Sequence, residues 1–214
     1  MKIVCLSDTH NCNEQISVPD GDILIHSGDA TITGTLIEIK LFNTWFASLP
    51  HKYKIFVAGN HDWLFEQDRE AAESLLDLGI IYLQDSSADI EGLKFYGSPW
   101  QPRFFDWAFN LMRGAEMAEK WKLIPEDTDV LITHGPPNGI LDAVPTRWGI
   151  ENAGCEELRK RGEELARIGR LKLHIFGHIH CGHGTHEELG VRFVNGSICD
   201  DQYAPTHAPI VVEI

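Results

Sequence analysis

The sequence lacks any long apolar run and any organised set of cysteines. It contains no stretch of about 18 consecutive apolar residues, the length that a helix needs to cross a bilayer. The N-terminal stretch MKIVCLSDTH is interrupted by charge too soon for a signal peptide, so we expect a cytoplasmic protein with no membrane partner. The five cysteines are odd in number, widely spaced and contain no C-x-x-C pair, which argues against a disulfide framework and a thiolate zinc site.

Positive charge is also scarce. The chain has 18 lysines and arginines against 32 acidic residues, which gives a formal net charge of −14. An average surface of this sign repels a long polyanion such as duplex DNA, so we expect no long nucleic acid as a partner. A small phosphate ester can still bind where bound cations make a site locally positive.

Internal repeats, low-complexity tracts and linker-like segments are absent, so we expect a single domain over residues 1–214. Runs rich in β-branched and aromatic residues predict strands at 2–7, 22–27, 53–58, 80–83, 93–97, 129–134, 171–177, 191–196 and 209–214. Several of them are apolar enough for burial on both faces. Apolar residues three and four positions apart predict helices near 36–49, 71–78, 115–124 and 155–168. This alternation predicts an α/β fold, and about nine strands favour two packed sheets with helices outside.

Polar residues cluster where five of the predicted strands end. The clusters are Asp8-Thr9-His10, Gly28-Asp29, Gly59-Asn60-His61-Asp62, His134, and His178 with His180. In an open α/β sheet, the loops that follow the carboxyl ends of strands converge on one ligand site. We therefore expect these side chains to lie together, although a solvated turn would explain any one of the motifs by itself.

The set of two carboxylates, one amide and four imidazoles indicates a metal site. The absence of thiolate disfavours copper(I) and iron–sulfur clusters, and the nitrogen content is too high for calcium or magnesium alone, which leaves manganese, iron or zinc. Seven ligands exceed the four that one tetrahedral ion takes. With one carboxylate shared, they suit two ions about 3.5–4 Å apart, which can clamp both oxygens of a phosphoryl transfer.

Other polar and aromatic residues have less specific patterns. His26 and His174 lie within predicted buried strands, and we expect both to be core histidines. Arg103, Arg113 and Arg147 could bind phosphate through their guanidinium groups, but arginines in loops are commonly solvated. The aromatic residues of 99–107 could stack on a nucleobase, pack in the core or anchor a loop.

Five motifs in order, SDTH, SGDA, GNHD, THGPP and GHIH, resemble the signature of the calcineurin-like metallophosphoesterase superfamily. The segments GSPWQPRFFDWAFN and VNGSICDDQYAPTHAPIVVEI are similar to those of the small phosphodiesterases called metallophosphoesterase-domain-containing proteins. The resemblance covers nearly the whole chain and implies a four-layer α/β/β/α sandwich of two mixed sheets flanked by helices. One departure is Ala30-Thr31 after SGD, where many relatives carry an aspartate or a leucine-type residue; we expect this change to lie beside the site.

The resemblance also implies roles for individual residues. One ion would be held by Asp8, His10, Asp29 and His180, and the other by Asp29, Asn60, His134 and His178, so that Asp29 bridges the two. A hydroxide between the ions would be the nucleophile. His61 would protonate the leaving alkoxide as a general acid, and Asp62 would orient His61 and support its protonated form. Gly59 would permit the sharp exit from its strand.

These features predict a two-metal-dependent phosphodiesterase that hydrolyses small phosphodiesters such as cyclic nucleotides, with manganese favoured and iron or zinc as alternatives. A phosphomonoesterase, including a protein phosphatase, would use the same ions in a differently lined pocket. A low-activity metal-binding scaffold is a third alternative. The expected mark of a scaffold is the loss of a ligand or of the general acid, and all of these residues are present.

Overall fold

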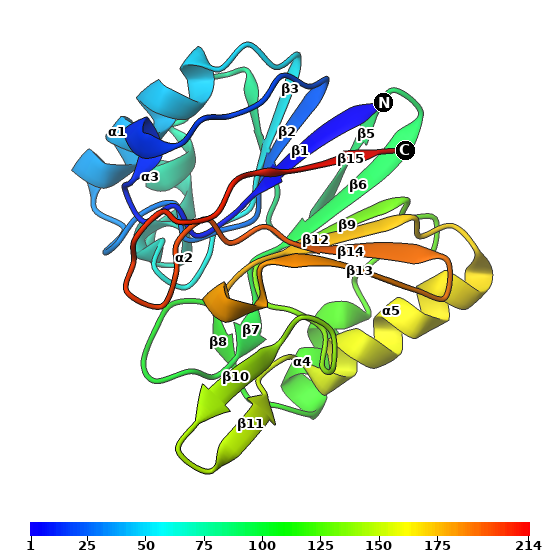
Figure 1. Ribbon diagram of the computed structural model, residues 1–214. Helices are drawn as coiled ribbons and strands as arrows, with labels where there is room; N and C mark the ends of the chain where they lie inside the picture. Colours follow the sequence, from blue (N-terminus) through cyan, green and yellow to red (C-terminus); the bar gives the residue numbers. More distant parts are fainter.

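Two β-sheets lie face to face at the centre of the molecule, as the computed structural model of residues 1–214 shows (Figure 1). The first sheet has five strands in the order β15-β1-β2-β3-β4. Four of them are parallel, and β15 pairs antiparallel with β1, which places the two chain ends side by side. The strands are β1 (Lys2–Leu6), β2 (Ile23–His26), β3 (Tyr53–Phe56), β4 (Ile80–Tyr82) and β15 (Ile210–Glu213).

The second sheet has six strands in the order β13-β14-β12-β9-β6-β5. Its four central strands are parallel, and an antiparallel strand closes each edge. The strands are β5 (Ser86–Ile90), β6 (Leu93–Ser98), β9 (Val130–Thr133), β12 (Leu173–Phe176), β13 (Gly184–Glu188) and β14 (Val191–Asn195). A parallel bridge between Ser7 and Ser197, just beyond β1 and β14, brings the carboxyl ends of the two sheets together.

The central strands are buried on both faces. In β1, Ile3 and Cys5 belong to the apolar cluster between the two sheets, whereas Val4 and Leu6 belong to the cluster between the first sheet and its helices. A third cluster lies between the second sheet and its helices. This double burial explains why the strands read as nearly continuous apolar runs, and it confirms the prediction made from them.

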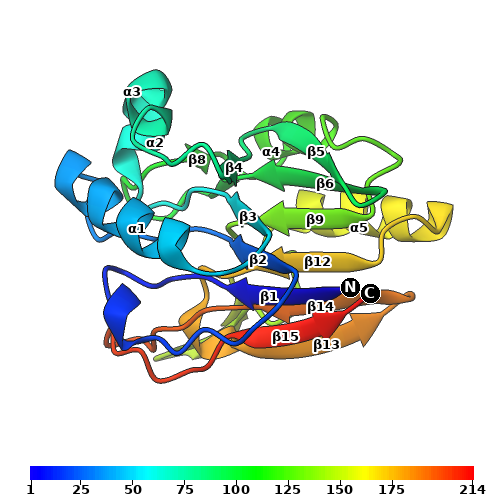
Figure 2. The same cartoon turned by 90° about the horizontal axis from the view of Figure 1, so that it is seen from above.

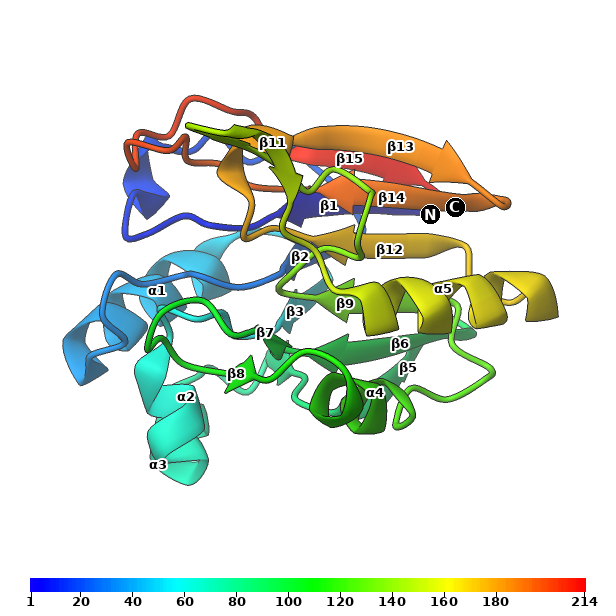
Figure 3. The same cartoon turned by 90° about the horizontal axis from the view of Figure 1, so that it is seen from below.

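Helices cover the outer face of each sheet. The helices α1 (Leu36–Ser48), α2 (Trp63–Gln67) and α3 (Arg69–Glu73) cover the first sheet, and α4 (Ala115–Trp121) and α5 (Glu156–Ile168) cover the second (Figures 2 and 3). The predicted four-layer α/β/β/α sandwich is therefore confirmed. None of these helices combines the length and the apolar character that crossing a membrane requires.

Short elements border the carboxyl ends of the central strands. The 3₁₀ turns are η1 (Asn13–Gln15) and η2 (His180–Gly182). Strand β7 (Gln101–Pro102) pairs with β8 (Asn110–Leu111), and β10 (Ala143–Thr146) pairs with β11 (Gly149–Asn152) in a hairpin that projects from the body of the protein (Figure 1). The sequence patterns predicted none of these elements.

The helix predicted over 71–78 was wrong in its second half. Helix α3 ends at Glu73, and the chain then turns as far as Gly79. The Asp77 N–H donates to the side-chain oxygen of Asn43 at 2.7 Å, which fixes this turn against α1. Leu75 and Leu76 still pack on the apolar cluster beneath α1, so their spacing reflects burial without a continuous helix.

Candidate metal centre

The carboxyl ends of β1, β2, β3, β9 and β12 converge where the two sheets meet. Backbone hydrogen bonds join the loops that follow these strands: Asp8 N–H donates to the Gly28 carbonyl at 2.8 Å, and Gly177 N–H donates to the His134 carbonyl at 2.9 Å. The convergence brings all seven predicted ligands together: Asp8, His10, Asp29, Asn60, His134, His178 and His180. Five of them are buried, and His178 and His180 are partly exposed.

Four of these ligands have left-handed backbone conformations. The φ angles are 53° at Asp8, 40° at His10, 54° at Asp29 and 67° at His178. Positive φ is uncommon outside glycine, and aspartate and histidine are among the residues that tolerate it best. Each such residue costs on the order of 1–3 kcal/mol, so the surrounding structure must impose these turns, as is frequent at functional sites.

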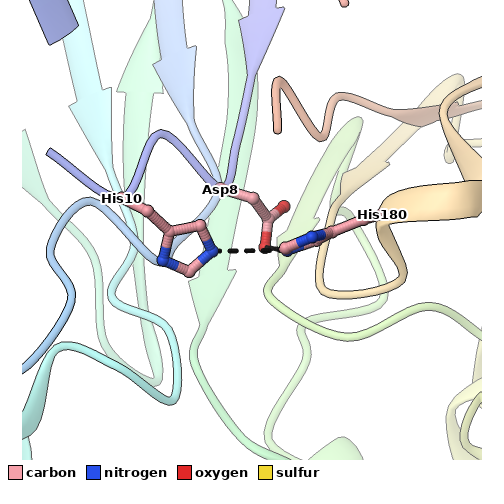
Figure 4. A group of neighbouring side chains, drawn as sticks. All are labelled: Asp8, His10 and His180. Atoms are coloured by element: carbon pink, nitrogen blue, oxygen red, sulfur yellow. Dashed lines mark hydrogen bonds and ion pairs between the residues drawn. The ribbon is translucent and has the colours of Figure 1, made fainter. Parts of the chain in front are cut away.

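The first group of ligands consists of Asp8, His10 and His180, whose donor atoms all lie within 4.8 Å of one another. His10 and His180 approach the Asp8 carboxylate from opposite sides, from the loops that follow β1 and β12 (Figure 4). The Nε2 atoms of the two rings are 3.3 Å apart, and His180 Nε2 lies 3.5 Å from Asp8 Oδ1. Ser197 Oγ donates to the other Asp8 oxygen at 2.8 Å and fixes the carboxylate.

The second group consists of Asp29, His134 and His178, again with donor atoms within 4.8 Å of one another. Asn60 joins this group, since its Oδ1 lies 2.9 Å from His134 Nε2. Asp29 Oδ2 lies 3.4 Å from His134 Nε2 and 3.8 Å from His10 Nε2 of the first group. Asp29 therefore lies between the two groups, within 4 Å of a nitrogen of each.

Backbone carbonyls set the tautomers of three ligand histidines. Nδ1 of His10 lies 3.2 Å from the Thr31 carbonyl, Nδ1 of His134 lies 3.0 Å from that of Ser27, and Nδ1 of His180 lies 2.9 Å from that of Asp200. A carbonyl can only accept, so Nδ1 carries the proton and the Nε2 lone pair faces the site. The facing lone pairs of His10 and His180 would repel one another unless a proton or a cation lies between them.

The electrostatics of the site also fit bound cations. Burial opposes the ionisation of Asp8, but the hydrogen bond and charge of His180 hold the pKa of this carboxyl well below its usual range. Burial likewise opposes a charged His134, yet Asp29 raises the pKa of His134 to about 9, and Asp8 raises that of His180 to about 9. The ionised carboxylates thus attract protons to these rings. Divalent cations would displace those protons, since a ligand histidine must be neutral at the coordinating nitrogen.

Gly59 is required for a reason different from the one expected. Its φ does not lie in the left-handed region, so freedom to turn is not what this position needs. A Cβ atom here would lie 2.3 Å from Asp29 Oδ1 and 2.7 Å from His134 Cε1. Gly59 therefore lets the loop after β3 approach the predicted ligands Asp29 and His134 closely.

His61 lies beside the ligands, but the predicted contact with Asp62 is wrong. His61 Nδ1 lies 2.7 Å from the Ile32 carbonyl, and Nε2 lies 4.0 Å from Asp29 Oδ2. The Asp62 carboxylate instead accepts from the N–H groups of Gly59, Ala30 and Thr31 and from the Thr31 hydroxyl. Asp62 thus joins the loop after β3 to the loop after β2, and Ile32 orients the His61 ring. The change at Ala30-Thr31 lies beside the ligands, as expected.

Some residues of the site carried no usable sequence signal. The Tyr203 ring contacts the rings of His10 and His180 edge-on, at centroid distances of 4.7 and 5.6 Å. It comes from the loop before β15, far from every ligand motif in the sequence. The Ile32 contact is made by a backbone carbonyl, which no residue type reveals. His26 and His174 are fully buried, as predicted.

The chain matches the family model described as calcineurin-like phosphoesterase over residues 1–182. It is 43% identical to metallophosphoesterase domain-containing protein 1 of Homo sapiens over 236 residues, which covers 100% of this chain and 71% of that protein. The Mus musculus protein of the same name gives the same values. A UPF0046 protein of Caenorhabditis elegans is 40% identical over 228 residues, which covers 100% of this chain and 75% of that protein. The family and the clustered ligands identify a metal-dependent phosphoester hydrolase, and the chain belongs to the calcineurin-like phosphoesterase family.

Proposed function

We propose that this protein is a two-metal-dependent phosphodiesterase that hydrolyses small phosphodiesters such as cyclic nucleotides. The observation that carries the proposal is a cavity of about 520 Å³ that opens onto the ligand cluster. Asp29, Asn60, His61, His178 and His180 line one part of it, and Phe104 and Tyr203 add aromatic surface. This volume lies within the usual range for small-molecule sites.

The two arginines that line this cavity already form ion pairs within the protein. Arg103 pairs with Asp106, and Arg113 pairs with Glu156 at 2.6 Å while also donating to the carbonyls of residues 153 and 154. Glu151 and Asp201 add negative charge to the lining. A phosphomonoester carries close to two negative charges at neutral pH, because its second pKa is about 6. A diester carries only one, so the lining favours the diester.

The donor set fits two divalent cations, which when bound would polarise the ester and supply an ionised water as nucleophile. Asp8, His10 and His180 would hold one cation, and Asn60, His134 and His178 would hold the other, with Asp29 shared. Manganese is the cation that we propose, with iron and zinc as alternatives that this mixed oxygen and nitrogen set also accepts.

We assign to His61 the transfer of a proton to the leaving group. With its Nδ1–H bound to the Ile32 carbonyl, the protonated ring presents Nε2–H to the cavity. As the bond from phosphorus to the leaving oxygen breaks, this proton moves to that oxygen and the ring becomes neutral. Asp62 supports the step indirectly, because it holds the loop of Asp29 against the loop of His61.

The net charge of −14 further favours small substrates over long nucleic acid. The cytoplasmic location and the absence of a membrane partner stay predictions.

The test compares two esters on protein that is first stripped of metal and then supplied with manganese. Bis(p-nitrophenyl) phosphate should be hydrolysed only after manganese is added, and faster than p-nitrophenyl phosphate at equal concentration. A preference for the monoester would overturn the phosphodiesterase in favour of a phosphomonoesterase. If two ions bind and neither ester is cleaved, the scaffold alternative gains support.

A further inference from the structure

The indole ring of Trp107 packs against the imidazole ring of His61 in a tilted arrangement. Their centroids are 4.1 Å apart and their planes are inclined by 32°. Two other aromatic rings approach His61, and both do so edge-on: His10 at 4.6 Å with an angle of 77° and Tyr203 at 5.9 Å with an angle of 66°. Trp107 is therefore the nearest of the three rings to His61 and the one whose plane is least inclined to it.

The loop that carries Trp107 is fastened to the loop that carries His61. Ala108 N–H donates to the Asn60 carbonyl at 3.1 Å, so the residues next to Trp107 and to His61 bond directly. The Gln101 side chain donates to the Ala108 carbonyl at 2.8 Å, and Phe109 N–H donates to the Glu66 carboxylate at 2.9 Å. These bonds hold the indole in place over the imidazole.

Neither core packing nor substrate contact accounts for Trp107. The residue is partly exposed and belongs to none of the three buried apolar clusters. It lines a separate open cavity of about 320 Å³, together with Trp63 and Met112. It does not line the larger cavity at the ligand cluster. The indole thus contacts His61 from outside the cavity that we propose for the substrate.

We propose that Trp107 is a positioning residue that holds His61 in the orientation for proton transfer; this inference rests on the proposed function. The indole face restrains rotation of the imidazole about its Cβ–Cγ bond, and the Ile32 carbonyl restrains Nδ1. Together they keep Nε2 directed at the leaving oxygen. A proton donor must lie within about 2.6–3.2 Å of its acceptor, and a misplacement of about 1 Å can cost about 100-fold in rate.

The test is the leaving-group dependence of Trp107→Leu in manganese-loaded protein. The substrates are bis(p-nitrophenyl) phosphate, diphenyl phosphate and a cyclic nucleotide, whose leaving groups are increasingly basic. A p-nitrophenolate departs without a proton, so its kcat should change less than about twofold. On the cyclic nucleotide kcat should fall about tenfold, which is a part of the 10²–10⁴-fold that general acid catalysis contributes in full. KM and bound manganese should stay at wild-type values.

Two further variants separate positioning from a structural effect. In a His61→Ala background, Trp107→Leu should cause no further fall in kcat, because Trp107 acts through the imidazole ring that is missing there. Trp148→Leu is the matched control, since Trp148 is 79% exposed and lies at the turn between β10 and β11; it should change none of the three rates. The proposal would be overturned if Trp107→Leu lowered kcat equally on all three diesters, or if it still lowered kcat in the His61→Ala background.

A second measurement does not depend on activity. In metal-free protein, the ring current of Trp107 should shift the Cε1–H and Cδ2–H proton resonances of His61 upfield, and His61→Ala assigns them by their disappearance. Trp107→Leu should return these resonances to the positions of an unstacked histidine, whereas Trp148→Leu should not move them. Unchanged His61 resonances in Trp107→Leu would overturn the proposal. Wild-type protein that cleaves no diester would instead contradict the proposed function, and this measurement would still decide whether the rings stack.

Discussion

Gly59→Ala should disrupt the metal centre without removing any ligand. The added Cβ would lie 2.3 Å from both the backbone nitrogen and Oδ1 of Asp29, and 2.7 Å from Cε1 of His134. Contacts of a Cβ below 3.0 Å are essentially never observed, so the loop of Gly59 must separate from both the backbone and the side chain of Asp29 by about 0.7 Å. This shift falls on the carboxylate that both ions would share.

The neighbours of Gly59 have little room to move. Asp29 Oδ1 accepts the His61 N–H at 2.8 Å, and His134 is fully buried with its Nδ1 bound to the Ser27 carbonyl. Overpacking of this kind typically costs about 1–3 kcal/mol of stability. Disturbing the groups that support metal ligands typically lowers metal affinity about 10–100-fold. We expect both effects in Gly59→Ala.

Calorimetric titration of metal-stripped protein with manganese measures the number of ions bound and their Kd, and thermal unfolding measures the stability. Gly162→Ala in α5 is the matched control, because a Cβ there meets no atom within 4 Å. Alanine also favours a helix over glycine by about 1 kcal/mol, so this variant should bind manganese normally and unfold no earlier. Two ions bound by Gly59→Ala with wild-type affinity would refute the reasoning that close approach requires this glycine.

His61→Ala should lower kcat on a cyclic nucleotide by about 10²–10⁴-fold while metal content, measured by atomic absorption, stays unchanged; retained turnover would rule out its role as acid. Asp29→Asn should weaken both ions together, because Oδ2 lies 3.8 Å from His10 and 3.4 Å from His134, and loss of a single ion would contradict the bridge. Burial lowers the pKa of His174 to about 3, so between pH 6.5 and 3 the unfolded chain binds a proton that the folded chain does not. Stability should therefore decline across this range as pH falls, by about 1.4 kcal/mol per pH unit from His174 alone. His174→Gln, which does not titrate, should flatten the pH dependence of the urea-unfolding free energy by that amount, and equal slopes would contradict this assignment.

The sequence was sufficient to predict that the candidate ligands lie together, because each of them lies within a few residues of the end of a strand. A strand that is buried on both faces leaves a clear apolar run, and the first polar residues beyond it lie at the carboxyl edge of the sheet. Asp8, Asp29 and Asn60 could therefore be placed at one edge before any contact was known. Their φ angles and the distances between them depend on contacts across both sheets, which a local pattern does not contain.

The missed strands lie at the margins of the fold. Strands β5 and β13 form the two edges of the second sheet, and the sequence of β13, GTHEE, is mostly polar. Edge strands need no apolar alternation and often carry charge, so their sequences resemble loops. The hairpin of β10 and β11 includes Pro145 and is largely exposed, and a proline within such a run argues against a strand.

His61 illustrates why a neighbour in sequence is a poor guide to a partner in space. Asp62 follows it directly, yet Asp62 points into the loops after β2 and β3 and accepts four hydrogen bonds there. The contact to His61 Nδ1 comes from Ile32, whose own N–H is held at 3.1 Å by Glu38 in the first turn of α1. Because the same Glu38 closes the capping box with Thr35, the start of a surface helix fixes the carbonyl that orients the proposed acid. The ring is thus set by α1 through Ile32 and by the loop of Trp107, two segments that share no motif with it.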